Sequence, residues 1–163
     1  MTTDQGPAPQ IISDADSKDK TTGIASGTIV LTLDGEIPVE HLAAGDRVIT
    51  RDSGIAVLKA VHMHEVTAQP YKISADRLGP DRPTVDTLVT ADQPILVRGL
   101  LARALFKSDS AMVPVSRLAD GEYIAKCEEQ TLRIYELEFD APHVIYANGL
   151  EIASSVRALA LAA

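Results

Sequence analysis

The sequence contains one cysteine, Cys127, and no tryptophan. A single cysteine cannot form an internal disulfide, and it leaves no cysteine cluster for a structural zinc site. Aromatic residues make up only 4% of the chain, so the core must be built from Val, Ile, Leu and Ala. Because β-branched side chains pack well on a pleated sheet, this composition favours β structure with an aliphatic interior.

Basic residues are also scarce. The chain has 15 Lys and Arg against 23 Asp and Glu, which gives a formal net charge of −8. Affinity for nucleic acid rests on clustered Lys and Arg, and the sequence has no basic run, so we expect no nucleic-acid partner. The acidic balance indicates a well hydrated surface and assigns no role by itself.

No long apolar run is present either. No segment approaches the roughly 20 apolar residues that cross a bilayer, so we expect no membrane insertion. Residues 1–20 carry four Asp and lack both the basic and the apolar region of a signal peptide. The sequence therefore predicts a soluble protein of the cytoplasm, and leaves open export by a route that needs no signal.

The length of 163 residues, of which 45% are hydrophobic, is enough for a single core. Residues 1–21 are rich in Pro, Asp, Lys and Ser, and this composition is typical of a disordered tail. Residues 156–163 contain helix formers and are expected to form a short C-terminal tail or helix. The folded body is then expected over residues 22–155.

Within this body, short apolar or alternating runs are separated by turn signals such as Asp34-Gly35 and Asn148-Gly149, as in a domain of many short strands. Strands alternating with long helices are missing, which argues against a parallel α/β fold. Short helices are predicted over 38–43 and 99–106. The expected strands are 28–32, 47–51, 55–64, 71–74, 84–90, 95–98, 112–114, 123–126, 131–139 and 144–147.

Four sequence blocks carry a family resemblance. They are Gly27-Thr28, residues 37–48, residues 89–97 and residues 135–149. In this order they resemble the blocks of hedgehog/intein (Hint) domains, and most closely those of stand-alone bacterial Hint-domain proteins. The resemblance implies an all-β fold, a curved disc of mostly antiparallel strands with pseudo-twofold halves and one or two short helices.

The resemblance also implies self-processing chemistry, but the residues at the family's chemical positions differ here. The family nucleophile, a Cys or Ser, falls at Gly23, which has no side chain. In the family's Thr-x-x-His segment the histidine protonates the departing amide, and Gln93 occupies that place. Gln93 cannot release a proton, and losing general-acid help typically costs about 10²–10⁴-fold in rate. Thr90, which would help to hold the scissile peptide, is retained.

The C-terminal junction shows the same replacement. Splicing members end in Gly-x-x-x-His-Asn followed by a Ser, Thr or Cys, and the Asn cyclises to cut the chain. Counting from Gly149, the corresponding residues are Ala153, Ser154 and Ser155. Ser154 cannot form the cyclic imide, whereas His143 retains the position of a family histidine near this junction.

Together these residues predict a degenerate, catalytically silent Hint-like domain that acts as a protein-binding or structural module. A partner strand or peptide, of unknown identity, would occupy the cleft where the family holds its own termini. Only short segments flank the body, so we expect no cargo to be released, and we expect no cofactor. The alternative left open is autoprocessing by substitute residues, such as Ser26 as nucleophile with His143 as base.

A metal site is a third hypothesis. His62 and His64 lie at alternate positions of an expected strand, so their side chains share a face, and His143 is a possible third ligand. No carboxylate stands at a spacing that would complete the site. We therefore expect exposed strand histidines and no metal, with His62 and His64 as the remaining candidates.

Overall fold

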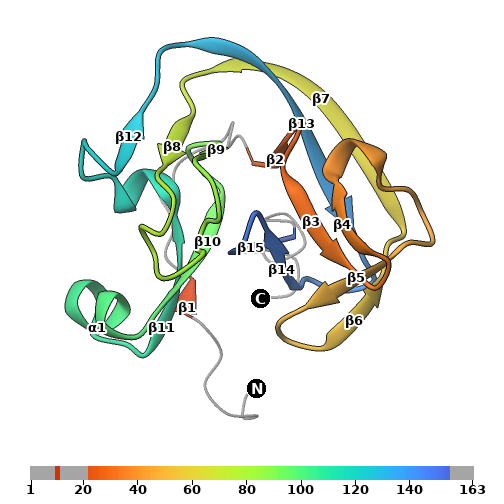
Figure 1. The fold of residues 1–163 in the computed structure, drawn as a ribbon, viewed down its shortest axis with the longest axis horizontal. Coiled ribbons are helices and arrows are strands. Elements are labelled where there is room, and N and C mark those ends of the chain that lie inside the picture. The colour runs from red at the N-terminus through yellow and green to blue at the C-terminus, as the bar shows by residue number, and fades with distance from the viewer. Residues whose placement is uncertain (1–9, 12–21, 155–163) are drawn as a thin grey trace.

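The computed structural model describes residues 10–11 and 22–154, which form two mostly antiparallel sheets (Figure 1). This confirms the all-β prediction. The larger sheet has the order β1 (Gln10–Ile11), β11 (Ser110–Pro114), β10 (Pro94–Arg98), β15 (Leu150–Ala153), β14 (Val144–Ala147), β3 (Ile29–Thr32), β5 (Arg47–Thr50) and β6 (Gly54–Val57), and β4 (Gly35–Pro38) pairs with β3. The smaller sheet has the order β12 (Ile124–Lys126), β8 (Tyr71–Ile73), β9 (Thr87–Val89), β2 (Ile24–Ala25), β13 (Gln130–Glu138) and β7 (Ala60–Ala68).

The longest pairing joins β7 to β13, and this ribbon arches over one side of the molecule (Figure 1). The single strand predicted over 55–64 is wrong, because the chain changes sheet at Leu58. The amide of Leu58 bonds the carbonyl of Asp46 in the larger sheet, whereas the next amide, of Lys59, bonds the carbonyl of Glu138 in the smaller one. One predicted strand thus becomes two strands, β6 and β7.

Each of the two pseudo-twofold halves contains a Pro-Val segment with the same local structure. Pro38 precedes a 3₁₀ turn, η1 (Val39–His41), and Pro114 precedes another, η2 (Val115–Leu118). The two prolines have nearly the same backbone, with φ/ψ of −56°/140° and −56°/139°, and Val39 and Val115 are both fully buried. The helix predicted over 38–43 is therefore a single 3₁₀ turn, because Pro38 still pairs in β4 and Leu42 is already extended.

The second predicted helix is present as α1 (Leu100–Phe106). It begins after Gly99, whose φ is 70°, and ends at Lys107 in the left-handed conformation. Of its side chains Ala102 is buried, whereas Leu100 and Leu105 are exposed. None of the helices within the described residues is long and apolar enough to cross a membrane.

The core lies between the sheets and is aliphatic, as the composition predicts. A smaller cluster of Leu96, Met112 and Ala153 packs on the other face of the larger sheet, so its central strands are covered on both sides. This explains why β15, whose four residues are all buried, lacks the alternating pattern of a half-exposed strand. The largest fully buried side chains are Leu58, Ile73, Ile95, Ile124, Leu137, Ile145 and Leu150.

The turn between β14 and β15 ties the two halves of the molecule together. Asn148 and Gly149 have φ of 51° and 87°, as an Asn-Gly hairpin turn requires. The Asn148 side chain accepts a hydrogen bond from the Ile29 amide at 2.8 Å and donates one to Thr87 at 2.9 Å. Gly149 packs so closely that an added Cβ would collide with the carbonyl oxygen of Asp81.

We expect Gly149→Ala to lower the free energy of unfolding by about 2–4 kcal/mol, because it adds a backbone clash to the strain of a positive φ. Urea denaturation followed by circular dichroism measures this loss.

The matched control is Gly121→Ala. Gly121 has a similar φ of 81°, but its added Cβ would meet no heavy atom within 4 Å. Gly121→Ala should lower the free energy of unfolding by only about 1 kcal/mol, which is the cost of a positive φ in a residue that has a side chain. Equal losses in the two variants would contradict the close contact at Gly149.

Candidate functional site

The side chain of Gln93 joins the first residue of the body to its last strand. Gln93 is 3% exposed and lies in the turn between β9 and β10. Its Oε1 accepts a hydrogen bond from the Gly23 amide at 3.0 Å, and its Nε2 donates to the carbonyls of Ala153 at 3.0 Å and Pro94 at 3.1 Å. The structure therefore brings together Gly23, Gln93 and Ala153, three of the residues at which the sequence resemblance places the family's chemical positions.

Thr90 begins the turn that presents Gln93. The Gln93 amide bonds the Thr90 carbonyl at 3.1 Å, and the Gln93 carbonyl accepts from Val115 at 3.1 Å. The Thr90 hydroxyl is buried and, within the described residues, is the one side-chain oxygen or nitrogen atom that is buried with no hydrogen bond. Leaving such a group unpaired typically costs about 1–3 kcal/mol, so a free buried hydroxyl is a feature that calls for a functional reason.

Ser154 forms a reciprocal pair with His143. The Ser154 amide donates to the His143 carbonyl at 2.9 Å, and the Ser154 hydroxyl accepts from the His143 amide at 3.1 Å. Ser154 is 7% exposed, so its hydroxyl is held by the backbone away from solvent. Ser155, the predicted position of the last nucleophile, lies outside the described residues.

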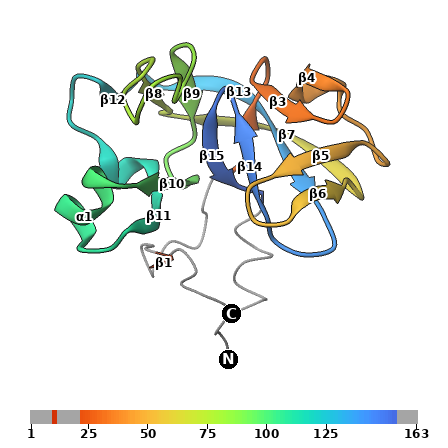
Figure 2. The same ribbon diagram turned by 60° about the horizontal axis from the view of Figure 1, so that its bottom comes forward.

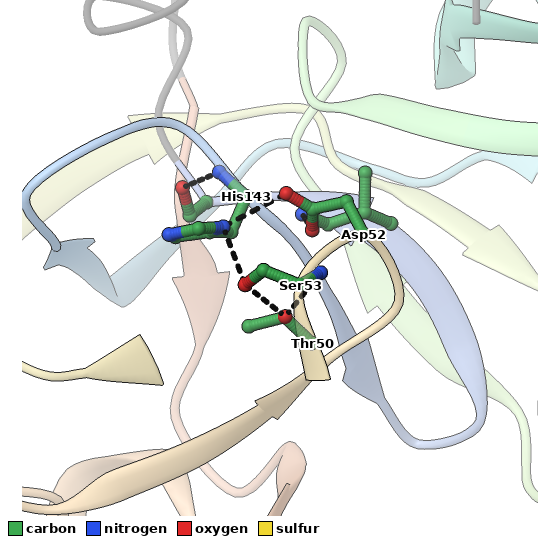
Figure 3. A network of polar contacts seen from close by, with 6 residues as sticks. Thr50, Asp52, Ser53 and His143 are labelled. Atoms are coloured by element: carbon green, nitrogen blue, oxygen red, sulfur yellow. Dashed lines mark hydrogen bonds and ion pairs between the residues drawn. The ribbon is translucent and has the colours of Figure 1, made fainter. Parts of the chain in front are cut away.

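His143 also belongs to a polar network with the loop between β5 and β6 (Figure 3). Its Nδ1 lies 2.8 Å from Oδ2 of Asp52, while Oδ1 of Asp52 accepts from the Val144 amide at 2.9 Å. Ser53 is 3.4 Å from the same Nδ1 and is bonded in turn to Thr50 at 2.9 Å. The carboxylate therefore orients the imidazole, and no described residue hydrogen-bonds its Nε2.

Sequence reasoning missed this network. Asp52, Ser53 and Gly54 are residue types common in turns, and nothing in such a stretch indicates which distant side chain it will contact. Asp52 and His143 are 91 residues apart and meet only because β5 pairs with β14, with Ile145 opposite Thr50. An edge-to-face contact with Phe139, at 5.6 Å between ring centroids, holds the imidazole from another side.

Ser26 lies in a different place, in the turn between β2 and β3. Its amide bonds the Arg133 carbonyl at 2.9 Å, and its side chain lies near the carboxylate of Glu40. The pKa of the Glu40 carboxyl is lowered, chiefly by the hydrogen bond from the Gly27 amide, with a smaller contribution from Ser26. Among the described residues Ser26 and His143 share no hydrogen-bond partner: Ser26 bonds Arg133, whereas His143 bonds Asp52 and Ser154.

The three histidines of the metal hypothesis are also not gathered. His62 and His64 are exposed on β7, and the Nε2 of His62 lies 2.8 Å from Oε1 of Glu138. His143 instead contacts Asp52. In the part of the chain that the structure describes, no group of three His, Cys, Asp or Glu is arranged to hold a metal ion.

An open groove of about 360 Å³ lies beside β2. Its lining includes Ser26, Thr28, Thr87, Arg133 and Asn148. A small neighbouring cavity shares Ala25, Thr28, Thr87 and Leu88 with the groove and is lined on its other side by Gly23 and Gln93. The groove and this cavity thus lie side by side, and Gln93 lines the cavity but not the groove.

Comparison with known proteins agrees with this arrangement. The DnaB intein from Synechocystis sp. PCC 6803 is 13% identical over 83% of this chain and 100% of its own, with a TM-score of 0.57. The bacterial intein-like domain from Clostridium thermocellum is 15% identical over 83% of this chain and 99% of its own, with a TM-score of 0.55. At these identities the likeness shows the fold alone. Among curated proteins no match was found.

The family model of the Hint domain matches residues 22–158, which cover nearly all of the described body and its C-terminal junction. Since this match extends over far more than half of the chain, the chain belongs to the Hint domain family.

Proposed function

We propose that this Hint domain is catalytically silent and binds another protein. The observation that carries the proposal is the hydrogen bonding of Gln93, which occupies both Nε2 hydrogens on backbone carbonyls and its Oε1 on the Gly23 amide. An acid catalyst needs a proton to give and freedom to reach the leaving nitrogen. A neutral amide with both donors committed offers neither.

The attacking position supports the same proposal. Gly23 has no side-chain nucleophile, and an added Cβ would come within 3.1–3.2 Å of Ile134 side-chain atoms. That separation is tighter than ordinary van der Waals contact, so β13 packs against the place where a nucleophilic side chain would begin. Acyl transfer to the side chain, the first step of self-processing, therefore has no attacking atom at this residue.

The C-terminal junction lacks cyclising chemistry as well. Ala153 contributes only its carbonyl, which Gln93 holds, and Ser154 has no amide group to close a ring. The Ser154 hydroxyl instead accepts from the His143 amide. These bonds fix the end of β15 in place.

The groove beside β2 supports the binding part of the proposal. Its volume of about 360 Å³ is in the range of about 300–1,000 Å³ typical of ligand sites. Hydroxyl groups of Ser26, Thr28 and Thr131 line it, together with Arg133. Such a lining offers both donors and acceptors to the main chain of an extended peptide.

If the domain has no self-processing activity, the chain keeps its full mass of 17.4 kDa when it is incubated at neutral pH, with or without hydroxylamine. Intact-mass spectrometry measures this directly. A shortened product would contradict the proposal, and its loss in Ser26→Ala would then identify the substitute nucleophile. The matched comparison is the double variant Gly23→Cys with Gln93→His, in which thiol-induced cleavage is expected if these two replacements cause the silence.

The structural part predicts that Gln93→Ala lowers the free energy of unfolding by about 2–4 kcal/mol, because buried backbone groups at Gly23 and Ala153 lose their partners. Urea denaturation measures the loss. Gln130→Ala is the control, since Gln130 is exposed on β13 and should change stability by less than about 0.5 kcal/mol. If both variants lose less than about 0.5 kcal/mol, the hydrogen bonds of Gln93 do not stabilise the fold.

The binding part predicts that a partner captured by the immobilised chain, from a lysate of the organism that encodes it, is lost when the groove is filled. Ser26→Trp should reduce the captured amount at least tenfold, whereas Ala104→Trp, on the exposed side of α1, should leave it unchanged. Quantitative mass spectrometry of the bound fraction compares the three baits. Equal capture by all three, or none by the unaltered chain, would refute binding in the groove.

A further inference from the structure

We propose that three arginines around Glu151 form a second interaction surface, which binds an acidic peptide segment of a protein partner. The surface consists of Arg51, Arg82, Arg98 and Glu151, and we call it the arginine cluster. It shares no residue with the lining of the groove beside β2, so it does not depend on the function proposed above.

Glu151 is an unusual residue for its position. It lies on β15 near the centre of the larger sheet, between β10 and β14 (Figure 2), and is only 4% exposed. A carboxylate buried there requires a cationic partner, because desolvation of an unpaired charge is very costly. Three arginines, from three different parts of the chain, pair with this carboxylate.

The arginines approach from different directions. The Nε of Arg98, at the end of β10, lies 2.7 Å from Oε1 of Glu151. The Nε of Arg51, just after β5, lies 3.1 Å from Oε2. Arg82, in the loop before β9, places Nη1 3.8 Å from Oε1.

Three guanidinium groups exceed what one carboxylate needs. A single bidentate arginine neutralises a buried glutamate, whereas here the cluster carries a surplus of two positive charges in a chain whose formal net charge is −8. Neighbouring guanidinium groups repel one another, so the surplus is unfavourable unless another anion shares it. The charge of the cluster is therefore complementary to an acidic ligand.

The bonding geometry leaves donors free to receive that ligand. Arg51 and Arg98 each use Nε alone for Glu151, although a guanidinium has five N–H donors. Their Nη groups make no hydrogen bond to any described residue, and both side chains are 39% exposed. Since Glu151 already holds the Nε atoms in place, little side-chain entropy remains to be lost on binding.

The arrangement favours a peptide over a single small anion. Arg98 reaches Glu151 from the β10 side, and Arg51 reaches it from the far side of β14. The two arginines thus bind different oxygens of the carboxylate, Arg51 at Oε2 and Arg98 at Oε1. A segment with two or more Asp or Glu side chains spans both positions, and planar carboxylates match the fork of the guanidinium group.

The test is a titration of the full chain with a fluorescently labelled hexaglutamate peptide, followed by anisotropy at low and at physiological salt. We expect binding that weakens with salt. The double variant Arg51→Lys with Arg98→Lys should weaken it at least tenfold, since each lysine still neutralises Glu151 but offers no outward fork. Circular dichroism and urea denaturation establish that this variant is folded.

Two further variants make the result specific. Arg77→Lys with Arg103→Lys alters two exposed arginines whose ion pairs lie elsewhere, and should change the affinity less than twofold. Glu151→Gln removes the competing carboxylate and keeps its shape, so it should tighten peptide binding several-fold.

A cluster that serves only to stabilise the sheet would bind no peptide in any variant, and that result would overturn the proposal. It would also be overturned by binding of inorganic phosphate without binding of the peptide, or by equal losses in the two double variants. The Ser26→Trp bait reports on the groove alone, so failure of one proposal is distinguishable from failure of the other.

Discussion

The arrangement of the site depends on three hydrogen bonds made by one buried amide. Gln93 links the amide of Gly23, before β2, to the carbonyl of Ala153, at the end of β15, and also binds the carbonyl of Pro94. No solvent reaches these groups to replace a missing partner, so the whole set must be satisfied together. A side chain used in this way holds the beginning and the end of the domain side by side, and that is a structural role which leaves it no free donor for chemistry.

The other residues of the site are polar. His143 remains oriented by Asp52, and the Thr90 hydroxyl remains buried with no partner among the described residues. Thus polar groups remain near Gly23 and Gln93, the two residues that the proposed function assigns to the positions where bonds would form and break. The proposed silence therefore rests mainly on the residues at two positions, Gly23 and Gln93, and a surface able to bind a peptide is compatible with it.

Electrostatics separates the two surfaces of the molecule. The groove beside β2 is lined by hydroxyl-bearing and apolar side chains with one acidic residue, Asp86, and one basic residue, Arg133, whereas the arginine cluster concentrates positive charge in an acidic chain. The cluster exists because Glu151 is buried within a sheet covered on both faces and still needs cations. A local requirement of the fold thereby creates a surface whose charge differs in sign from that of the chain as a whole.

The sequence by itself determined the strand-rich fold, its aliphatic interior and the family blocks, because composition, alternation and turn residues act locally. It also led to the hypothesis that Gly23 and Gln93 stand at the family's chemical positions, which requires only counting along the chain. Only the tertiary structure decided where the run over 55–64 changes sheet, that Asp52 meets His143, and that three distant arginines share Glu151. The physical reason is that these contacts join residues far apart in the chain, and strand pairing, which no local pattern encodes, brings them together.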